Sequence, residues 1–282
     1  MKRVVKRVWE SAPVWAWIVM IVCVIILIVG LVISSNRTAP TTSANTANTT
    51  NATPSTEATG TPASVEFIDY AKSHPDEDRT IVLLGDSTGA STTGWAPALG
   101  RAISESLDRP MATAYWNTQT AKYGSPVSLG TGTNGPIGFW NGSASGRDAA
   151  YAADNLTALT TTPGGEAITP NLVLLNFGLT EDTDQPLAPQ IQPLITAVQA
   201  KFPDAAIAVI KQNPPRDSDN SEQVSGFAAA MDAEGIQVID VYSAFPADAK
   251  ARAELMTDAV NPNADGQKLW TKTVLAAFGL QE

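Results

Sequence analysis

The sequence predicts a three-layer α/β/α sandwich with a mostly parallel sheet, preceded by one N-terminal transmembrane helix. Three observations lead to this fold class. Strand-like apolar runs alternate with helical patterns, as in βαβ units with right-handed crossovers. Residues 81–84 and 172–175 are unbroken apolar runs, typical of strands buried on both faces of a parallel sheet. Residues 14–33 form an uncharged stretch of about 20 residues, enough to cross a hydrocarbon layer of roughly 30 Å.

The N-terminal region has the features of a retained membrane anchor. Four basic residues precede the uncharged stretch, whereas only Arg37 follows it closely. Because positive charge stays on the cytoplasmic side, residues 1–13 are predicted to be a cytoplasmic basic tail and the rest extracytoplasmic. The alternative is a cleaved secretory signal, which has about 7–15 apolar residues and a small-residue cleavage site. No clean site follows Ile33, so we expect a single-pass protein of the cell envelope, with the membrane as a partner.

Residues 34–64 consist almost wholly of Thr, Ala, Asn, Ser and Pro. A segment so poor in large apolar side chains cannot offset the entropy cost of ordering itself, so it is predicted to be a disordered linker. Such a linker would hold the following domain clear of the membrane. The one cysteine, Cys23, lies in the predicted span, which excludes disulfides and cysteine-based metal sites from the domain.

The remaining residues, 65–282, have the length of one domain. Residues 1–37 carry a net charge of +4 and the rest of the chain −14. A domain this acidic argues against nucleic acid and anionic surfaces as partners. No cluster of metal ligands stands out, and the acidic run at residues 181–184 is interpreted as a solvated loop. We therefore expect no metal and no cofactor.

The strands and helices of this domain are predicted to alternate along the chain. The predicted strands are residues 80–84, 111–116, 137–140, 172–176, 205–211 and 237–241. The predicted helices are residues 95–107, 147–159, 188–201, 221–234 and 264–278. No pattern predicts the structure of the segment 117–136.

Ser87 follows the first predicted strand in the sequence Gly85-Asp86-Ser87. Ligands of open α/β sheets bind just beyond the carboxyl ends of the strands, which places Ser87 at the ligand-binding edge. By itself such a tripeptide is usually only a turn between a strand and a helix. Its functional interpretation depends on three further stretches.

These three stretches also carry polar turns beside predicted strands and helices. Residues 141–146, NGSASG, lead from a short strand into an Ala-rich helix, where a glycine backbone can approach a ligand closely. Residues 176–184, NFGLTEDTD, leave a buried strand at the same edge of the sheet. Residues 258–263, DAVNPN, precede the closing helix.

In this order and spacing the four stretches resemble the SGNH (GDSL) hydrolase superfamily, over residues 81–278. The resemblance implies an SGNH-hydrolase or flavodoxin-like sandwich in which Ser87 is the nucleophile and Gly146 an oxyanion-hole donor. Two positions depart from the family pattern. Thr180 replaces the oxyanion-hole Asn of the third block, and Asn261 replaces the catalytic His that accompanies the acid, here Asp258. Residues 212–216, QNPPR, also resemble the loop after the fifth strand in members from actinobacteria and their phages.

The replacement of the histidine removes the expected general base. A serine hydroxyl is a poor nucleophile until a base takes its proton, and an amide is no such base. The only histidine in the chain, His74, precedes the first strand and is expected roughly 15 Å or more from Ser87. Asp258 is a weak substitute base. Loss of the base typically costs on the order of 10⁶ in turnover.

Three functions therefore stay open. The first is a membrane-anchored extracytoplasmic serine esterase or acyltransferase, weak or degenerate, acting on acyl esters of envelope lipids or glycans. It would use Ser87, the oxyanion donors Gly146 and Thr180, and the Asp258–Asn261 pair. The second is a non-catalytic module that binds an acylated small molecule, lipid or glycan. The third is an envelope scaffold with a vestigial pocket.

Overall fold

The computed structural model describes residues 60–281. The predicted basic tail, the predicted transmembrane span and the linker up to residue 59 lie outside the described residues, as does Glu282. None of the helices between residues 60 and 281 is long and apolar enough to cross a membrane.

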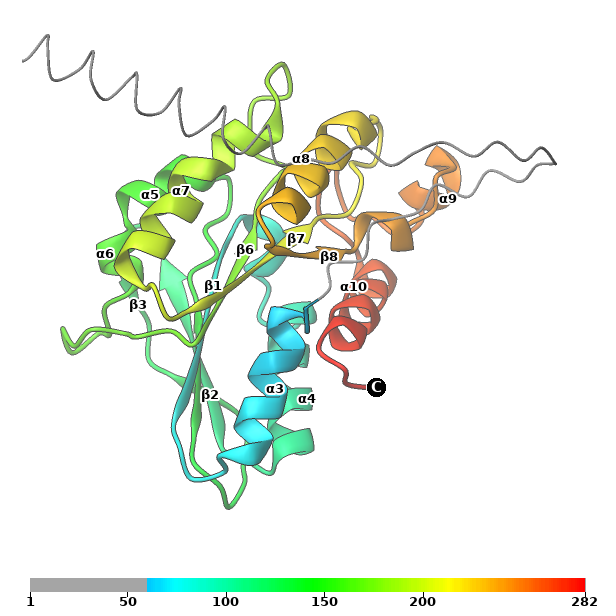
Figure 1. The fold of residues 1–282 in the computed structure, drawn as a ribbon. Helices are drawn as coiled ribbons and strands as arrows, with labels where there is room; N and C mark the ends of the chain where they lie inside the picture. Colours follow the sequence, from blue (N-terminus) through cyan, green and yellow to red (C-terminus); the bar gives the residue numbers. More distant parts are fainter. Residues whose placement is uncertain (1–59, 282) are drawn as a thin grey trace, which may run out of the picture. The chain divides into compact units, whose positions relative to one another are not determined.

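A single sheet of eight strands forms the middle layer (Figure 1). Its strands are β1 (Arg79–Gly85), β2 (Met111–Asn117), β3 (Lys122–Tyr123), β4 (Val127–Gly130), β5 (Ile137–Asn141), β6 (Leu172–Asn176), β7 (Ala206–Lys211) and β8 (Gln237–Asp240). The order across the sheet is β3-β2-β5-β1-β6-β7-β8, and β4 also pairs with β2. All neighbours are parallel except β3 and β4, which run antiparallel to β2. The mostly parallel sheet confirms the predicted fold class for the domain.

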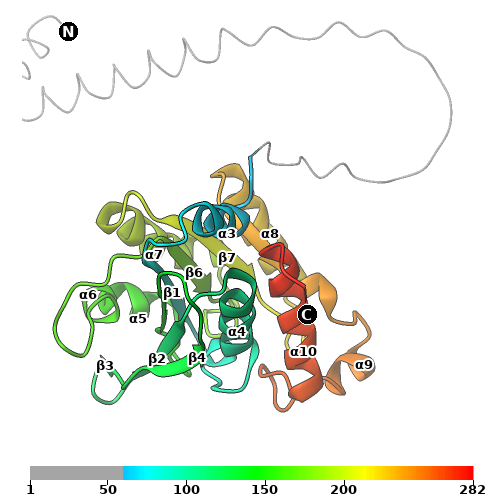
Figure 2. The same cartoon turned by 90° about the horizontal axis from the view of Figure 1, so that it is seen from below.

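Helices cover both faces of this sheet (Figure 2). One face packs against α3 (Ala63–Ser73), α4 (Trp95–Leu107) and α10 (Ala264–Ala277). The other packs against α5 (Ala149–Asp154), α6 (Leu156–Leu159), α7 (Leu187–Lys201) and α8 (Ser221–Ala233). The short helix α9 (Ala249–Ala253) and the 3₁₀ turns η1 (Ser87–Gly89) and η2 (Tyr242–Ala244) lie in connections.

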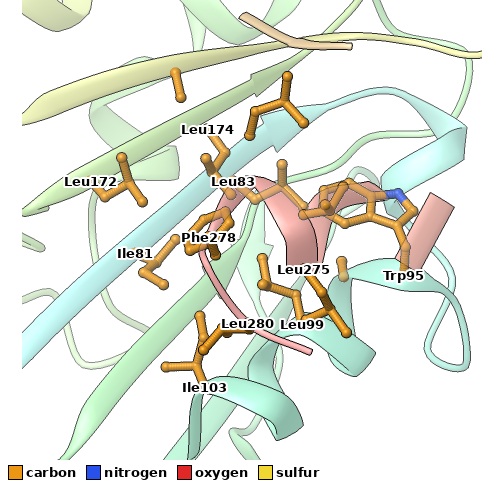
Figure 3. Close-up of a cluster of buried hydrophobic side chains, with 14 of the residues drawn as sticks. Ile81, Leu83, Trp95, Leu99, Ile103, Leu172, Leu174, Leu275, Phe278 and Leu280 are labelled. Carbon is orange, nitrogen blue, oxygen red and sulfur yellow. The ribbon is translucent and has the colours of Figure 1, made fainter. Parts of the chain in front are cut away.

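The apolar run of β1 supplies both hydrophobic cores in alternation. Ile81 and Leu83 pack with α4 and α10 in one core, shown in Figure 3, while Val82 and Leu84 pack in the other. All four are completely buried. Successive side chains of a strand point to opposite faces, so only a continuous apolar run can fill both layers.

The predicted strands are all present within about one residue, and four of the five predicted helices match equally well. The exception is residues 147–159, which form two short helices with a break at Asn155. The side-chain amide of Asn155 donates to the carbonyl of Tyr151 at 2.9 Å and shares this acceptor with its own backbone N–H. Residues 117–136, which no pattern resolved, contain the short strands β3 and β4. The helix α3 begins at Ala63, inside the segment assigned to the linker.

The parallel register brings four turns to one edge of the sheet. Gly85 at the end of β1 pairs with Asn176 at the end of β6, and Leu83 pairs with Asn141 at the end of β5. The end of β7 lies beside β6. The turns that follow these strands therefore meet, as expected for a ligand-binding edge.

Candidate active site

The turn after β1 presents Ser87 as the first residue of η1. Gly85 has no room for a side chain, since a Cβ there would lie 2.9 Å from the Cβ of Asn176. Asp86 then caps the turn, because its carboxylate accepts the backbone N–H of Thr88 at 2.9 Å. Ser87 itself is half-buried. Within the described residues, neither its hydroxyl nor its backbone N–H makes a hydrogen bond, so both are free to act on a ligand.

Beneath Ser87 lies a buried polar network centred on Asp86. The Thr88 hydroxyl donates to this carboxylate at 2.7 Å, and the side-chain amide of Gln212 donates to it at 3.0 Å. Asn176 in turn donates to the Thr88 hydroxyl at 2.8 Å. Burial raises the pKa of Asp86 above its ordinary value, although these hydrogen bonds oppose the shift. The network anchors the turn after β1 to the ends of β6 and β7.

The turn after β5 lies against the turn after β1. Ala144 donates its backbone N–H to the carbonyl of Gly85 at 2.8 Å, and the Asn141 side chain donates to the carbonyl of Gly89 at 2.9 Å. Gly146 is exposed at the end of this turn with φ of +68°, a left-handed conformation that favours glycine. Its backbone N–H has no acceptor among the described residues, as an oxyanion donor requires.

Thr180 lies beyond β6, at the predicted position of the third oxyanion donor. Its hydroxyl donates to the backbone carbonyl of Arg147 at 3.0 Å. This bond uses the hydroxyl proton. It also joins the turn after β6 to the turn after β5.

Glu181 differs from the solvated loop that the sequence suggested for the acidic run. It is only 8% exposed, and its carboxylate accepts the backbone N–H of Ala149 at the start of α5, at 3.1 Å. Burial is the main cause that raises the pKa of Glu181, and the nearby charge of Asp86 adds to the shift. Asp182 and Asp184 are exposed, as the sequence suggested.

Asp258 and Asn261 form a hydrogen-bonded pair before α10. The carboxylate accepts the Asn261 side-chain amide at 2.9 Å and the backbone N–H groups of Asn261 and Val260 at 2.7 and 2.9 Å. These bonds, the side-chain amide first, lower the pKa of Asp258 below its ordinary value. The carboxylate is therefore ionised and stabilised by three donors, which makes it a poor proton acceptor.

A groove of about 870 Å³ brings Ser87 and Asn261 together, with Ser145 from the turn after β5. Gly146, Thr180 and Asp258 are not among the residues that line it. Most lining side chains carry hydroxyl or amide groups: Ser91, Thr93, Thr257, Asn263, Gln267 and Thr271. The apolar side chains of the lining are Ala90, Ala98, Pro262 and Ala264, and Lys268 adds one charged group. The groove thus offers hydroxyl, amide and ammonium groups to a ligand, beside small apolar contacts.

His74 lies at the opposite end of β1 from Ser87. It caps the C-terminus of α3, is exposed, and stacks on Tyr70 with ring centroids 4.0 Å apart. The strand between them, Arg79–Gly85, spans about 20 Å at the usual rise per residue. The histidine cannot act on Ser87.

The residues that sequence reasoning missed come from the turn after β7. Gln212 supports the turn after β1, as described above, and Asn213 donates to the carbonyl of Val260 at 3.2 Å, beside Asn261. The backbone N–H of Arg216 donates to the carbonyl of Ala259 at 2.8 Å. The motif QNPPR at residues 212–216 marked this turn, but no local pattern could show what its amides contact. Within residues 60–281 no three His, Cys, Asp or Glu side chains gather as metal ligands.

Comparison with known proteins identifies the fold. No protein-family model matches the sequence, and no curated protein matches it. A two-domain esterase active on acetylated mannans has a TM-score of 0.53 and 14% identity, over 76% of this chain and 51% of that chain. A GDSL-like lipase from Parabacteroides merdae has a TM-score of 0.50 and 14% identity, over 72% of this chain and 97% of that chain.

A psychrotrophic esterase from Pseudoalteromonas sp. is 19% identical, with a TM-score of 0.48, over 72% of this chain and 97% of that chain. Similarity at such identities concerns the fold alone. Residues 60–281 of this chain have the fold of the SGNH (GDSL) hydrolase superfamily.

Proposed function

We propose that this protein is a membrane-anchored, extracytoplasmic SGNH-type serine esterase that binds acyl esters and turns them over slowly. One observation carries the proposal. Ser87 stands in the groove with a hydroxyl and a backbone N–H that make no hydrogen bond among the described residues, while Asn261, which lines the same groove, carries an amide rather than an imidazole.

In the proposed reaction, the Ser87 oxygen attacks the ester carbonyl and forms a tetrahedral oxyanion. The backbone N–H groups of Ser87 and Gly146 would donate to that oxyanion, since neither has another acceptor among the described residues. Collapse expels the alcohol and leaves an acyl-serine, which water then hydrolyses. The oxyanion donors and binding alone retain roughly 10³–10⁴ of rate enhancement over water.

The slow step in this scheme is the loss of the serine proton. The amide oxygen of Asn261 can accept a hydrogen bond but does not take a proton at neutral pH, and Asp258 is already held by three donors. The proton must therefore pass to water or hydroxide. This predicts turnover that rises with pH and does not level off near pH 7, where a histidine would titrate.

The groove favours a short acyl group on a polyhydroxyl alcohol, such as an acylated glycan. Hydroxyl and amide side chains can pair with sugar hydroxyls, and the apolar residues of the lining are three alanines and one proline, too small to enclose a long acyl chain. One protein of the same fold is described as active on acetylated mannans, which agrees with a ligand of this kind. The predicted anchor at residues 14–33 would place such a ligand in the cell envelope.

The experiment is labelling with a fluorophosphonate, which reacts with an activated serine, followed by hydrolysis of a short-chain aryl ester. We expect slow labelling at Ser87 and slow hydrolysis, both lost in Ser87→Ala. Ser91→Ala is the matched control, because Ser91 lines the same groove. Absence of any Ser87-dependent labelling or turnover above the buffer rate would rule out the enzymatic function.

The second candidate is a binding module for the same acylated ligands, without turnover. The Asn261–Asp258 pair favours it, because this pair leaves no proton acceptor at the base position. The purified protein should then retain an acylated compound from a lipid or glycan extract, and Ser87→Ala should retain it equally well. If nothing is retained and Ser87 is inert, the scaffold function remains.

A further inference from the structure

The two halves of the groove come from separate parts of the chain. Ser87 lies on η1, just before α4, whereas Asn261 lies on the loop before α10. Within the described residues, no hydrogen bond joins Ser87 to Asn261. The distance between Ser87 and Asn261 must therefore be fixed by the buried residues packed below the groove.

A continuous series of contacts joins the two halves below the groove. The indole N–H of Trp95 donates to the carbonyl of Thr88, next to Ser87, at 3.0 Å. The ring of Trp95 stacks on Trp270 with centroids 5.2 Å apart. The indole N–H of Trp270 donates to the Asn213 side-chain oxygen at 2.9 Å, and the Asn213 amide donates to the carbonyl of Val260 at 3.2 Å, next to Asn261.

Burial limits the partners and orientations that these side chains can adopt. Trp95, Trp270 and Asn213 have no measurable exposure, so no water can replace a lost partner. The Asn213 amide also has only one orientation that satisfies both neighbours, with its oxygen toward the Trp270 donor and its nitrogen toward the Val260 acceptor. Stacked indoles at this spacing add directional packing.

Two further hydrogen bonds connect the same parts of the chain. The backbone N–H of Trp95, at the start of α4, donates to the Gln267 side chain on α10 at 2.9 Å. The backbone N–H of Arg216 donates to the carbonyl of Ala259 at 2.8 Å, so the turn after β7 holds the Asn261 loop twice.

We propose that Trp95, Trp270 and Asn213 are positioning residues that set the separation of Ser87 and Asn261 across the groove. They act through the backbone on either side and touch no ligand. The effect of these residues on turnover rests on the proposed esterase function, whereas their effect on the distance across the groove does not. Each effect therefore has its own measurement.

The first measurement is geometric and uses the full-length chain in detergent with Cys23→Ser, which leaves no other cysteine. Thr93→Cys and Thr257→Cys place one spin label on each of the two parts of the chain that line the groove, at exposed positions. Pulsed electron spin resonance then gives the distribution of distances between the labels. We expect a narrow distribution that broadens in Trp95→Phe and in Trp270→Phe, since each loses an indole N–H.

Trp116→Phe is the matched control. Trp116 is also buried and donates its indole N–H to the Tyr151 hydroxyl at 3.0 Å, but it belongs to the core on the other face of the sheet. This variant should keep the narrow distribution despite a similar loss of stability. If Trp270→Phe does not fold, Asn213→Ser keeps both indoles and tests the same link to Val260.

The second measurement is kinetic and uses Asn261→His as the background, in which a base is present. Trp95→Phe and Trp270→Phe should lower kcat about 10- to 100-fold, with a smaller change in KM, because misplacing the reacting groups slows chemistry more than binding. Equal distance distributions in all three Phe variants would overturn the proposal. An inert Ser87 in every background would refute the esterase function instead, and the distance measurement would still decide the role of these residues.

Discussion

Asn261 donates its side-chain amide N–H to the Asp258 carboxylate over 2.9 Å, and its amide oxygen receives no hydrogen bond from the described residues. The pair thus joins a carboxylate to an amide, and an amide does not take a proton at neutral pH. A histidine at this position could make the same bond to Asp258 through one ring nitrogen and leave the other free toward the groove.

We therefore expect Asn261→His to raise ester hydrolysis by about 100-fold or more, the usual contribution of a positioned general base. The pH profile should then level off above the pKa of the new imidazole. Steady-state kinetics with a short-chain aryl ester measures both effects. Asn261→Gln is the control, since it changes the side chain without adding a base. If the histidine variant is as slow as the glutamine variant, Ser87 is not aligned with position 261.

Thr180→Asn tests the other departure from the family pattern. The Thr180 hydroxyl proton is used by the carbonyl of Arg147, whereas an asparagine amide has two N–H donors and a longer reach. In the Asn261→His background we expect Thr180→Asn to raise kcat about 10- to 100-fold, because the asparagine amide would add one hydrogen-bond donor to the oxyanion. Thr180→Val should not raise it. An increase with both variants would show that removal of the bond to Arg147, rather than the new donor, is responsible.

Gly146→Ala separates backbone strain from function. Gly146 and Gly279 share φ of +68°, both are exposed, and a Cβ on either would meet nothing within 4 Å. Alanine at either position should therefore cost about 1–2 kcal/mol of stability, measured by urea unfolding. Only Gly146→Ala should slow fluorophosphonate labelling of Ser87, because only that backbone N–H is proposed to face the reacting oxygen. Equal labelling rates in the two variants would remove Gly146 from the oxyanion hole.

Asp86→Asn should change how stability depends on pH. Because burial raises the pKa of Asp86 in the folded state, the folded protein holds this proton after the unfolded chain has released it. Stability is therefore fully present below the ordinary carboxyl pKa, near 4, and is lost as pH rises through the folded-state value. Asp86→Asn removes this loss, because an asparagine side chain does not titrate in this range.

Urea unfolding between pH 4 and pH 8 measures this effect. We expect Asp86→Asn to flatten the profile and to be more stable than the native chain at pH 8. Glu181→Gln provides a comparison, because burial also raises the pKa of Glu181 in the folded state. An Asp86→Asn profile as steep as that of the native chain would show that Asp86 is not the group that titrates.

Much of the fold could be predicted because it depends on local patterns. The run at residues 81–84 predicts a strand buried on both faces, and β1 is such a strand at the centre of the sheet. The side-chain oxygen of Asn263 accepts the backbone N–H groups of Asp265 and Gly266, which explains why α10 begins where the sequence predicts. The position of Ser87 at the carboxyl edge follows from the same strand.

The sequence alone determined the alternation of strands and helices, the position of Ser87 and the absence of a histidine from the place of the base. Only the tertiary structure decided what supports them. Gln212 reaches Asp86 across 126 positions of sequence, and Asn213 reaches Trp270 across 57. A side-chain amide carries no periodic pattern that reveals its partner, because that partner is chosen by how the packed sheet and helices bring distant turns together.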